Sequence, residues 1–239
     1  MANSYFKFKQ FVVHQEHCAM KVTTDACLFG AWCAEKMNHL SLNNILDIGT
    51  GTGLLSLMLA QENTHAIIDA VEIDTDAAQQ AISNINISNF KNSITVYNTP
   101  IQNFESNKLY DFIISNPPFF ENDLKSEKTN RNIALHSTTL DLKELINSIK
   151  CHLNSHGYFA ILLPTHRVEY FKNLAFDFNL IFEINVKQTE QHAVFRVILM
   201  YENLQNNILK QDEIFIKHKE ANHYSSAFIQ LLEPYYLNL

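Results

Sequence analysis

The chain has 239 residues, 46% of them hydrophobic, which is enough to bury a full core within one α/β domain. Its 25 acidic residues outnumber its 18 basic ones, and the formal charge of −7 argues against sequence-blind binding to nucleic acid through a broad cationic surface. The sequence has no signal-like segment and no apolar run of about eighteen residues, so we expect a soluble protein that does not enter a membrane.

Apolar runs alternate with helical patterns along much of the chain. Strands are predicted over 44–48, 66–71, 94–97, 110–114 and 157–163, and helices over 54–61, 74–87 and 140–153. Two later strand-like runs, 180–186 and 194–200, have no clear helix between them and suggest an antiparallel pair that closes the sheet. Because strands and helices alternate, the pattern predicts a mostly parallel, doubly wound α/β sheet.

Three of the five glycines lie together at Gly49, Gly51 and Gly53, between the first predicted strand and the first helix. Ligands of such sheets bind outside the carboxyl ends of the strands, where glycine lets the backbone approach them closely. Glu72 lies 19 residues after Gly53, at the end of the second predicted strand, where a carboxylate can accept both hydrogen bonds of a ribose diol. These residues predict a nucleoside-binding pocket.

The spacing of the glycines distinguishes between two nucleoside cofactors. A dinucleotide fingerprint reads G-x-G-x-x-G, whereas this chain has G-x-G-x-G preceded by Asp47. The run from Asp47 to Gly53 resembles the first motif of class I S-adenosylmethionine-dependent methyltransferases, in which the acid helps to organise the turn near the methionine part. The cofactor expected is therefore S-adenosyl-L-methionine, and the alternative is a tight glycine turn that holds no ligand.

A second motif, Asn116-Pro117-Pro118-Phe119, directly follows the fourth predicted strand and therefore belongs at the same edge of the sheet. A nitrogen conjugated to a ring is a poor nucleophile, so its amino group must be held for in-line attack. The Asn116 side chain and the Pro117 carbonyl can each accept one N–H bond, close to the cofactor methyl group. Pro118 would stiffen the turn and Phe119 would stack on the substrate ring.

Asn-Pro-Pro-Phe alone could be a rigid β-turn, but its place after the glycine motif favours a catalytic role. The combination resembles the N-P-P-[FY] motif of methyltransferases that act on adenine N6, guanine N2 or a protein glutamine amide. The motif indicates a planar nitrogen and does not choose among these three acceptors.

Segments throughout the chain carry a more specific resemblance. They are 6–11, 14–15, 19–25 and 28–32, then Arg131, Ala134 and His136, and finally Tyr224, Phe228 and 235–237. They resemble the bacterial tRNA1(Val) (adenine(37)-N6)-methyltransferase family, which implies N6-methylation of an adenine beside the anticodon of a valine tRNA. The resemblance also implies one Rossmann-like class I methyltransferase domain over 1–239. Residues 1–43 would form the substrate and cofactor entrance, and 44–239 a seven-stranded core whose last strand is antiparallel.

The resemblance implies that Lys21, Thr24 and Asp25 line the entrance and that Arg131 touches phosphate, although each could equally belong to a solvated polar face. The chain departs from the family's pattern in two places. It has Asn98-Thr-Pro-Ile-Gln102 where methyltransferases often place an acid near the adenine ring, and Leu135 where a basic residue is usual.

Three rival functions remain open. A release-factor glutamine methyltransferase normally has a helical domain before the glycine motif, but only 46 residues precede Asp47 here. An rRNA guanine-N2 methyltransferase usually has a second, degenerate domain, for which this chain is too short. A non-catalytic cofactor- or RNA-binding module would not depend on Asn116. The four cysteines have no C-x-x-C or zinc-like spacing, so we expect no metal and a protein of the reducing cytoplasm.

Overall fold

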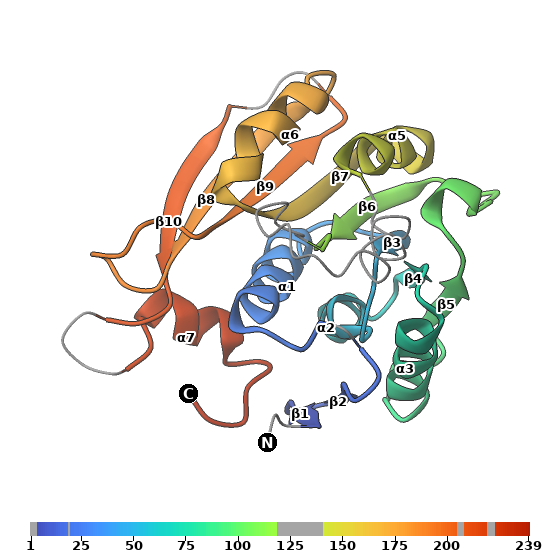
Figure 1. Ribbon diagram of the computed structural model, residues 1–239, viewed down its shortest axis with the longest axis horizontal. Coiled ribbons are helices and arrows are strands. Elements are labelled where there is room, and N and C mark those ends of the chain that lie inside the picture. The colour runs from blue at the N-terminus through green and yellow to red at the C-terminus, as the bar shows by residue number, and fades with distance from the viewer. Residues whose placement is uncertain (1–3, 19, 119–140, 205–207, 219–222) are drawn as a thin grey trace, which may run out of the picture.

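The computed structural model describes residues 4–18, 20–118, 141–204, 208–218 and 223–239. Its centre is an eight-stranded sheet with the strand order β10-β8-β9-β7-β6-β3-β4-β5 (Figure 1). The strands are β3 (Asn44–Ile48), β4 (Ile67–Glu72), β5 (Ile94–Asn98), β6 (Tyr110–Ser115), β7 (Leu153–Pro164), β8 (Asn179–Lys187), β9 (Arg196–Glu202) and β10 (Lys210–Phe215). Only β9 runs antiparallel to its neighbours, so the other seven strands share one direction.

Helices cover both faces of this sheet (Figure 1). The helices α1 (Thr24–Met37), α2 (Leu54–Glu62), α3 (Thr75–Asn86) and α7 (Ser226–Leu232) contribute to the core on one face. The other face packs against α5 (Leu142–His152) and α6 (Val168–Leu174). Alternate residues of the central strands enter the two cores: Ile45 and Phe112 face the first, whereas Leu46 and Ile113 face the second. This alternation is what a sheet buried on both faces requires.

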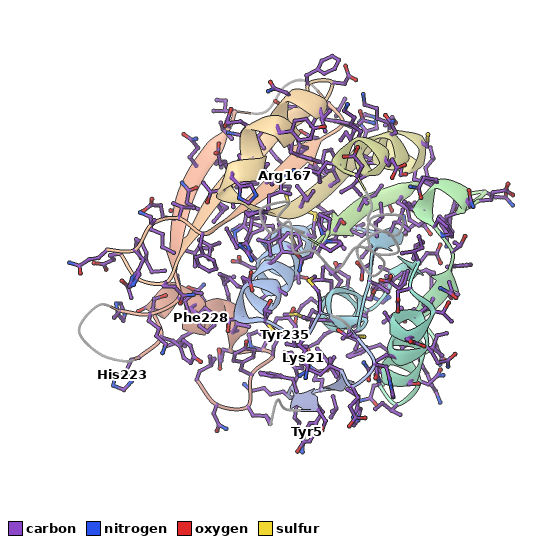
Figure 2. All side chains as sticks on the ribbon, in the orientation of Figure 1. Tyr5, Lys21, Arg167, His223, Phe228 and Tyr235 are labelled. Carbon is purple, nitrogen blue, oxygen red and sulfur yellow. The ribbon has the colours of Figure 1, made fainter. Side chains whose placement is uncertain are left out.

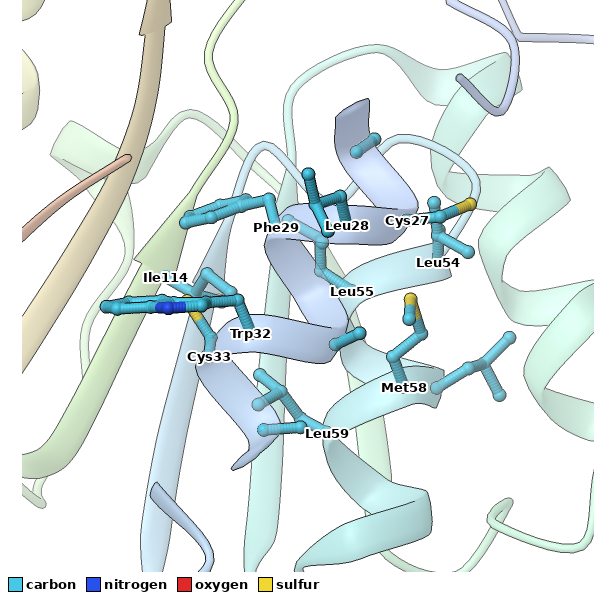
Figure 3. Close-up of a cluster of buried hydrophobic side chains, with 14 of the residues drawn as sticks. Cys27, Leu28, Phe29, Trp32, Cys33, Leu54, Leu55, Met58, Leu59 and Ile114 are labelled. Carbon is cyan, nitrogen blue, oxygen red and sulfur yellow. The ribbon is translucent and has the colours of Figure 1, made fainter. Parts of the chain in front are cut away.

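The helices α1 and α2 pack closely beside the sheet. Figure 3 shows Trp32 and Phe29 of α1 next to Ile114 of β6, with Met58 and Leu55 of α2 on the other side of the helix. Gly30 makes the close approach possible, because a β-carbon there would lie 2.7 Å from the Met58 sulfur. The packing of these two helices holds the start of α1 and the start of α2 on the same side of the molecule.

A two-stranded antiparallel ribbon, β1 (Tyr5–Lys7) with β2 (Val12–His14), precedes α1. It contacts the C-terminal segment, because the Lys9 N–H donates to the Tyr235 carbonyl over 2.8 Å and Phe8 forms a bridge with Tyr236. The first and last segments of the chain therefore lie side by side.

The predicted fold class is confirmed, including the antiparallel pairing of the runs at 180–186 and 194–200 as β8 and β9. The count of seven strands and the antiparallel last strand need correction. An eighth strand, β10, follows β9 and pairs in parallel with β8. Its first four residues are exposed and polar, so no apolar alternation marks it in the sequence. No helix in the described part of the chain is long and apolar enough to cross a bilayer.

Candidate active site

The ends of three neighbouring strands meet at one edge of the sheet. The glycine turn follows β3, Glu72 ends β4 and Asn116 follows β6. Hydrogen bonds join these strand ends: the Gly49 N–H donates to the Val71 carbonyl over 2.8 Å, and the Ser115 hydroxyl donates to the Ile48 carbonyl over 2.8 Å. The two motifs predicted from the sequence therefore share one fixed edge.

The three glycines of the turn have left-handed backbone conformations. Their φ angles are 73° at Gly49, 57° at Gly51 and 82° at Gly53, and no other described residue has a positive φ. Such conformations disfavour side chains. A β-carbon at Gly49 or Gly51 would meet no atom within 4 Å, whereas one at Gly53 would lie 3.6 Å from Ala81 of α3. The first two glycines thus border open space, and the third packs against a helix.

Asp47 organises the turn from beneath. It is completely buried, and its Oδ2 accepts hydrogen bonds from the hydroxyls of Thr50 (2.6 Å) and Ser56 (2.7 Å). The other oxygen, Oδ1, has no hydrogen-bond partner among the described residues. Burial raises the pKa of Asp47 to about 6, the two hydroxyls counteract that rise, and the nearby Glu72 adds to it. The carboxylate ties the turn to the first turn of α2 and keeps one oxygen unused.

Glu72 is 9% exposed, and both of its carboxylate oxygens accept backbone hydrogen bonds. Oε2 accepts from the Gly51 N–H over 2.8 Å and Oε1 from the Asp74 N–H over 2.9 Å. Burial raises its pKa against the effect of these hydrogen bonds. Each oxygen has further lone pairs, so the group can still accept two hydroxyls.

Asn98 lies in the segment where methyltransferases often have an acid near the adenine ring of the cofactor. Its amide donates to the carbonyls of Glu72 (3.0 Å) and Ile73 (3.2 Å), and its oxygen accepts from the Thr75 hydroxyl over 3.1 Å. Asn98 thus holds the backbone that carries Glu72. The Ile73 side chain beside it is 40% exposed, an apolar surface next to the carboxylate.

Asn116 lies immediately after β6, and its side-chain oxygen is buried without a hydrogen-bond partner in the described part of the chain. Pro117 is buried and Pro118 is half-buried, so the backbone around Asn116 is constrained. A buried acceptor without a donor is costly and rare in proteins, and it points to a donor from a ligand. Phe119 and Arg131, the other predicted residues of this region, lie outside the described residues.

The predicted entrance residues differ in their surroundings. Lys21, between β2 and α1 in the chain, is exposed (Figure 2), and so is Thr24, the first residue of α1. Asp25 is instead half-buried and paired with Arg196, because its Oδ2 lies 2.9 Å from Nε of Arg196. Sequence reasoning left Arg196 out of the site. The predicted antiparallel direction of this strand could have indicated its place. Arg196 is the first residue of β9 and pairs with Pro164 at the end of β7, so it lies at the edge where the parallel strands end.

A Rossmann-like sheet with this glycine turn, a carboxylate at the end of the next strand and an Asn-Pro-Pro sequence at the same edge is typical of the class of S-adenosylmethionine-dependent methyltransferases. The family model "Methyltransferase small domain" matches residues 31–198. Among solved structures, a protein of Agrobacterium tumefaciens described as a predicted O-methyltransferase has a TM-score of 0.69 at 13% identity, over 87% of this chain and 95% of the other. A protein of Listeria monocytogenes assigned to the class I enzymes has a TM-score of 0.63 at 15% identity, over 92% and 71%.

Curated relatives narrow the assignment. A tRNA1(Val) (adenine(37)-N6)-methyltransferase of Dyadobacter fermentans is 41% identical over 98% of both chains. One of Pseudoalteromonas translucida is 40% identical over 99% of this chain and 100% of the relative. The chain belongs to the tRNA1(Val) (adenine(37)-N6)-methyltransferase family, and it is a methyltransferase whose methyl donor is S-adenosylmethionine.

Proposed function

We propose that this protein transfers a methyl group from S-adenosylmethionine to the exocyclic N6 of adenine 37 in tRNA1(Val). The observation that carries the proposal is the Asn116 oxygen, a buried acceptor without a described partner on the same sheet edge as Glu72 and the glycine turn. An amino group supplies the missing donor, and relatives at 41% and 40% identity are named for this reaction.

The residues at the edge fit the cofactor. Glu72 would accept the two ribose hydroxyls, Ile73 would pack against the adenine ring, and the open space beside Gly49 and Gly51 would admit the methionine part. The unused oxygen of Asp47 lies beneath the same turn and suits a cationic ammonium group. When bound, S-adenosylmethionine supplies an electrophilic methyl group.

The chain's own part in the reaction is to hold the acceptor amine. Asn116 Oδ1 and the Pro117 carbonyl would each accept one N–H of the adenine amino group, which turns the nitrogen lone pair toward the methyl group. Pro118 restricts the backbone that presents both acceptors. No strong base is needed, because the nitrogen becomes acidic as it gains the methyl group and can then release a proton to water.

The acidic chain would contact RNA locally rather than through a broad surface. We propose Lys21 and Thr24 as entrance contacts, because both are exposed just before and at the start of α1. Arg167, which lies where β7 passes into α6 (Figure 2), packs over the Tyr170 ring at 5.6 Å and could bind phosphate. Asp25, held by Arg196, would position this entrance rather than touch RNA.

We further propose that residues 1–239 act as one methyltransferase domain, with the entrance segment fastened to the C-terminal segment through Lys9 and Tyr235. A tRNA substrate would place the protein in the cytoplasm. In the described part of the chain, no group of three or more His, Cys, Asp or Glu side chains is arranged to hold a metal.

The deciding experiment is mass spectrometry of nucleosides from tRNA incubated with S-adenosylmethionine and either wild-type protein or Asn116→Ala. The proposal expects N6-methyladenosine from the wild type only, with cofactor binding retained by the variant, and mass spectrometry of oligonucleotides from the same tRNA should assign it to position 37. Parallel incubations with rRNA and with protein test the other planar-nitrogen acceptors, and N2-methylguanosine or methylglutamine there, with tRNA unmodified, would overturn the proposal.

A further inference from the structure

The segment between β2 and α1 is held against α3. We call residues 14–18 and 20–22 the N-terminal strap. The Gln15 side chain closes it, since its oxygen accepts from the Val22 N–H over 2.7 Å. The His17 N–H donates to the Gln80 side chain of α3 over 3.4 Å. The strap includes the exposed entrance residue Lys21 and ends two residues before the other one, Thr24.

Asn84 of α3 connects this strap to the glycine turn. It is 0% exposed, and its Oδ1 accepts from the His14 N–H over 2.9 Å. Its amide group donates to the His14 carbonyl over 2.8 Å and to the Thr52 carbonyl over 2.9 Å. One side chain therefore pairs with both backbone groups of His14, as a neighbouring strand would, and uses its remaining hydrogen on the turn.

Two further contacts place the strap close to the cofactor residues. Gly53 of the turn packs against α3, since a β-carbon there would be in ordinary van der Waals contact, 3.6 Å, with Ala81, about one turn of helix before Asn84. Cys18 of the strap is buried, and its pKa is raised to about 11. Burial is the larger cause, and the nearby carboxylates of Glu72 and Asp74 add to it. The strap thus runs from the neighbourhood of the glycine turn toward the Glu72 carboxylate.

We propose that Asn84 is a positioning residue that fixes the glycine turn and the N-terminal strap relative to each other, so that cofactor binding orders the entrance to the active site. Its three hydrogen bonds all go to backbone groups, so it acts through main-chain position. Because the turn is part of the cofactor site and the strap ends at the entrance, a change at one side is transmitted through Asn84 to the other. The inference rests on the methyltransferase assignment and not on the identity of the RNA.

The test uses the full chain and S-adenosylhomocysteine as the probe. Asn84→Ala should weaken binding of this probe roughly tenfold, because one buried hydrogen bond to the turn is lost. Asn86→Ala is the matched control, since Asn86 is exposed near the end of the same helix, and it should bind like wild type. Calorimetric titration gives the dissociation constants. Wild-type affinity in Asn84→Ala would overturn the proposal.

Asn84→Asp separates a lost hydrogen bond from a general loss of packing, because only the first makes the dissociation constant depend on pH. The ionised carboxylate keeps an acceptor for the His14 N–H but has no hydrogen for the carbonyls of His14 and Thr52, whereas the protonated form can donate to one of them again. The ratio of its dissociation constant to that of wild type should therefore fall as the pH is lowered from about 8 to about 5.5. A ratio that stays constant would contradict the proposed contact.

Hydrogen exchange of the wild-type protein tests the coupling without any substitution, and so decides the matter even if Asn84→Ala does not fold. Saturating S-adenosylhomocysteine should slow exchange in a peptide covering the strap as well as in the glycine turn. In Asn84→Asp at neutral pH, protection should remain at the turn and be lost in the strap. Unchanged exchange of the wild-type strap on binding would overturn the proposal, and because no RNA is present, such a failure leaves the tRNA assignment untouched.

Discussion

The Oε2 atom of Glu72 accepts a 2.8 Å hydrogen bond from the backbone N–H of Gly51. The residue expected to hold the ribose and the turn expected to admit the methionine part are thus directly connected. The ribose and the methionine part of the cofactor would therefore meet two protein groups, Glu72 and the glycine turn, whose relative position is fixed before binding. Preorganisation of this kind raises affinity because less freedom is lost on binding.

Replacing this carboxylate by an amide tests the connection. Glu72→Gln places an NH₂ group against one of two backbone donors, Gly51 or Asp74, so one hydrogen bond becomes a donor-donor contact. We expect at least about a tenfold loss of S-adenosylmethionine affinity and about 1–3 kcal/mol less stability. Titration calorimetry and thermal unfolding measure the two effects. The exposed Glu105→Gln is the control, and equal affinities for the two variants would refute the role.

Asn116 should contribute to catalysis far more than to stability. Its oxygen has no described partner, so Asn116→Ala removes no hydrogen bond known within the protein. We expect kcat to fall about 10²–10³-fold, as for the loss of one aligned transition-state contact, with cofactor affinity and melting temperature nearly unchanged. Methyl transfer to tRNA and cofactor titration give both quantities, with the exposed Asn103→Ala as control. Activity within about threefold of wild type would remove Asn116 from the reaction.

Asp47 predicts a specific pH dependence of stability. Because burial raises its pKa from the usual 3.8 to about 6, the folded protein binds this proton more tightly than the unfolded chain. The stability from this group is fully present below about pH 4 and is lost as the pH rises through about 6. Asp47→Asn keeps an acceptor for Thr50 and Ser56 and cannot ionise.

The free energy of unfolding of Asp47→Asn minus that of wild type should therefore increase between about pH 4 and about pH 7, by up to about 3 kcal/mol, and then level off. Urea denaturation at several pH values measures it. The same variant should bind S-adenosylmethionine more weakly at neutral pH, because the buried negative charge is gone. A difference in stability that does not vary with pH would show that Asp47 ionises normally.

Two glycine substitutions should have opposite consequences. Gly51 has φ 57° and open space around its missing β-carbon, so Gly51→Ala should cost only about 1 kcal/mol of stability but hinder the cofactor. Gly30→Ala puts its methyl group 2.7 Å from the Met58 sulfur, which should cost about 1–3 kcal/mol without changing cofactor affinity. Thermal unfolding and cofactor titration of both variants separate the two effects, and a cofactor affinity unchanged by Gly51→Ala would contradict the site.

The Asp25–Arg196 ion pair distinguishes positioning from direct substrate contact. If Asp25 acts through Arg196, then Asp25→Ala, Arg196→Ala and the double variant should raise the KM for tRNA by similar factors, without additivity. The pair is partly exposed, so its contribution to stability should be only about 1 kcal/mol. Steady-state kinetics of the three variants decide the question. Additive effects would indicate that Asp25 acts independently of Arg196.

The sequence predicted those parts of the structure whose signal is local. The strand at Asn44–Ile48 has the predicted bounds, because its apolar run ends sharply at the glycine turn. The helix α1 was missed because it is buried on nearly all sides and lacks an amphipathic period. The Asp25–Arg196 pair joins residues 171 positions apart, and nothing in the local pattern of either residue indicates the other.

Asn84 illustrates the same limit on a single helix. Its neighbours Ala77, Ala81 and Ile85 form the apolar side that predicted the helix, and an Asn in that pattern is unremarkable. Only the tertiary structure brings His14 and Thr52 to its two polar groups. The motifs therefore predicted which edge of the sheet carries the proposed site, whereas the residues that support this edge became visible through their contacts.

The eighth strand, β10, affects whether the sheet can pair with strands of other molecules in solution. As the last strand on its side of the sheet, β10 presents one row of backbone groups that pairs with no other strand of the sheet. Such rows are templates for the strands of other chains and can seed aggregation. Lys210, Asp212 and Glu213 make this row highly charged and exposed, and charge on an edge strand opposes that kind of pairing. The same polarity that leaves β10 without an apolar pattern in the sequence thus opposes strand pairing with a second molecule at this edge.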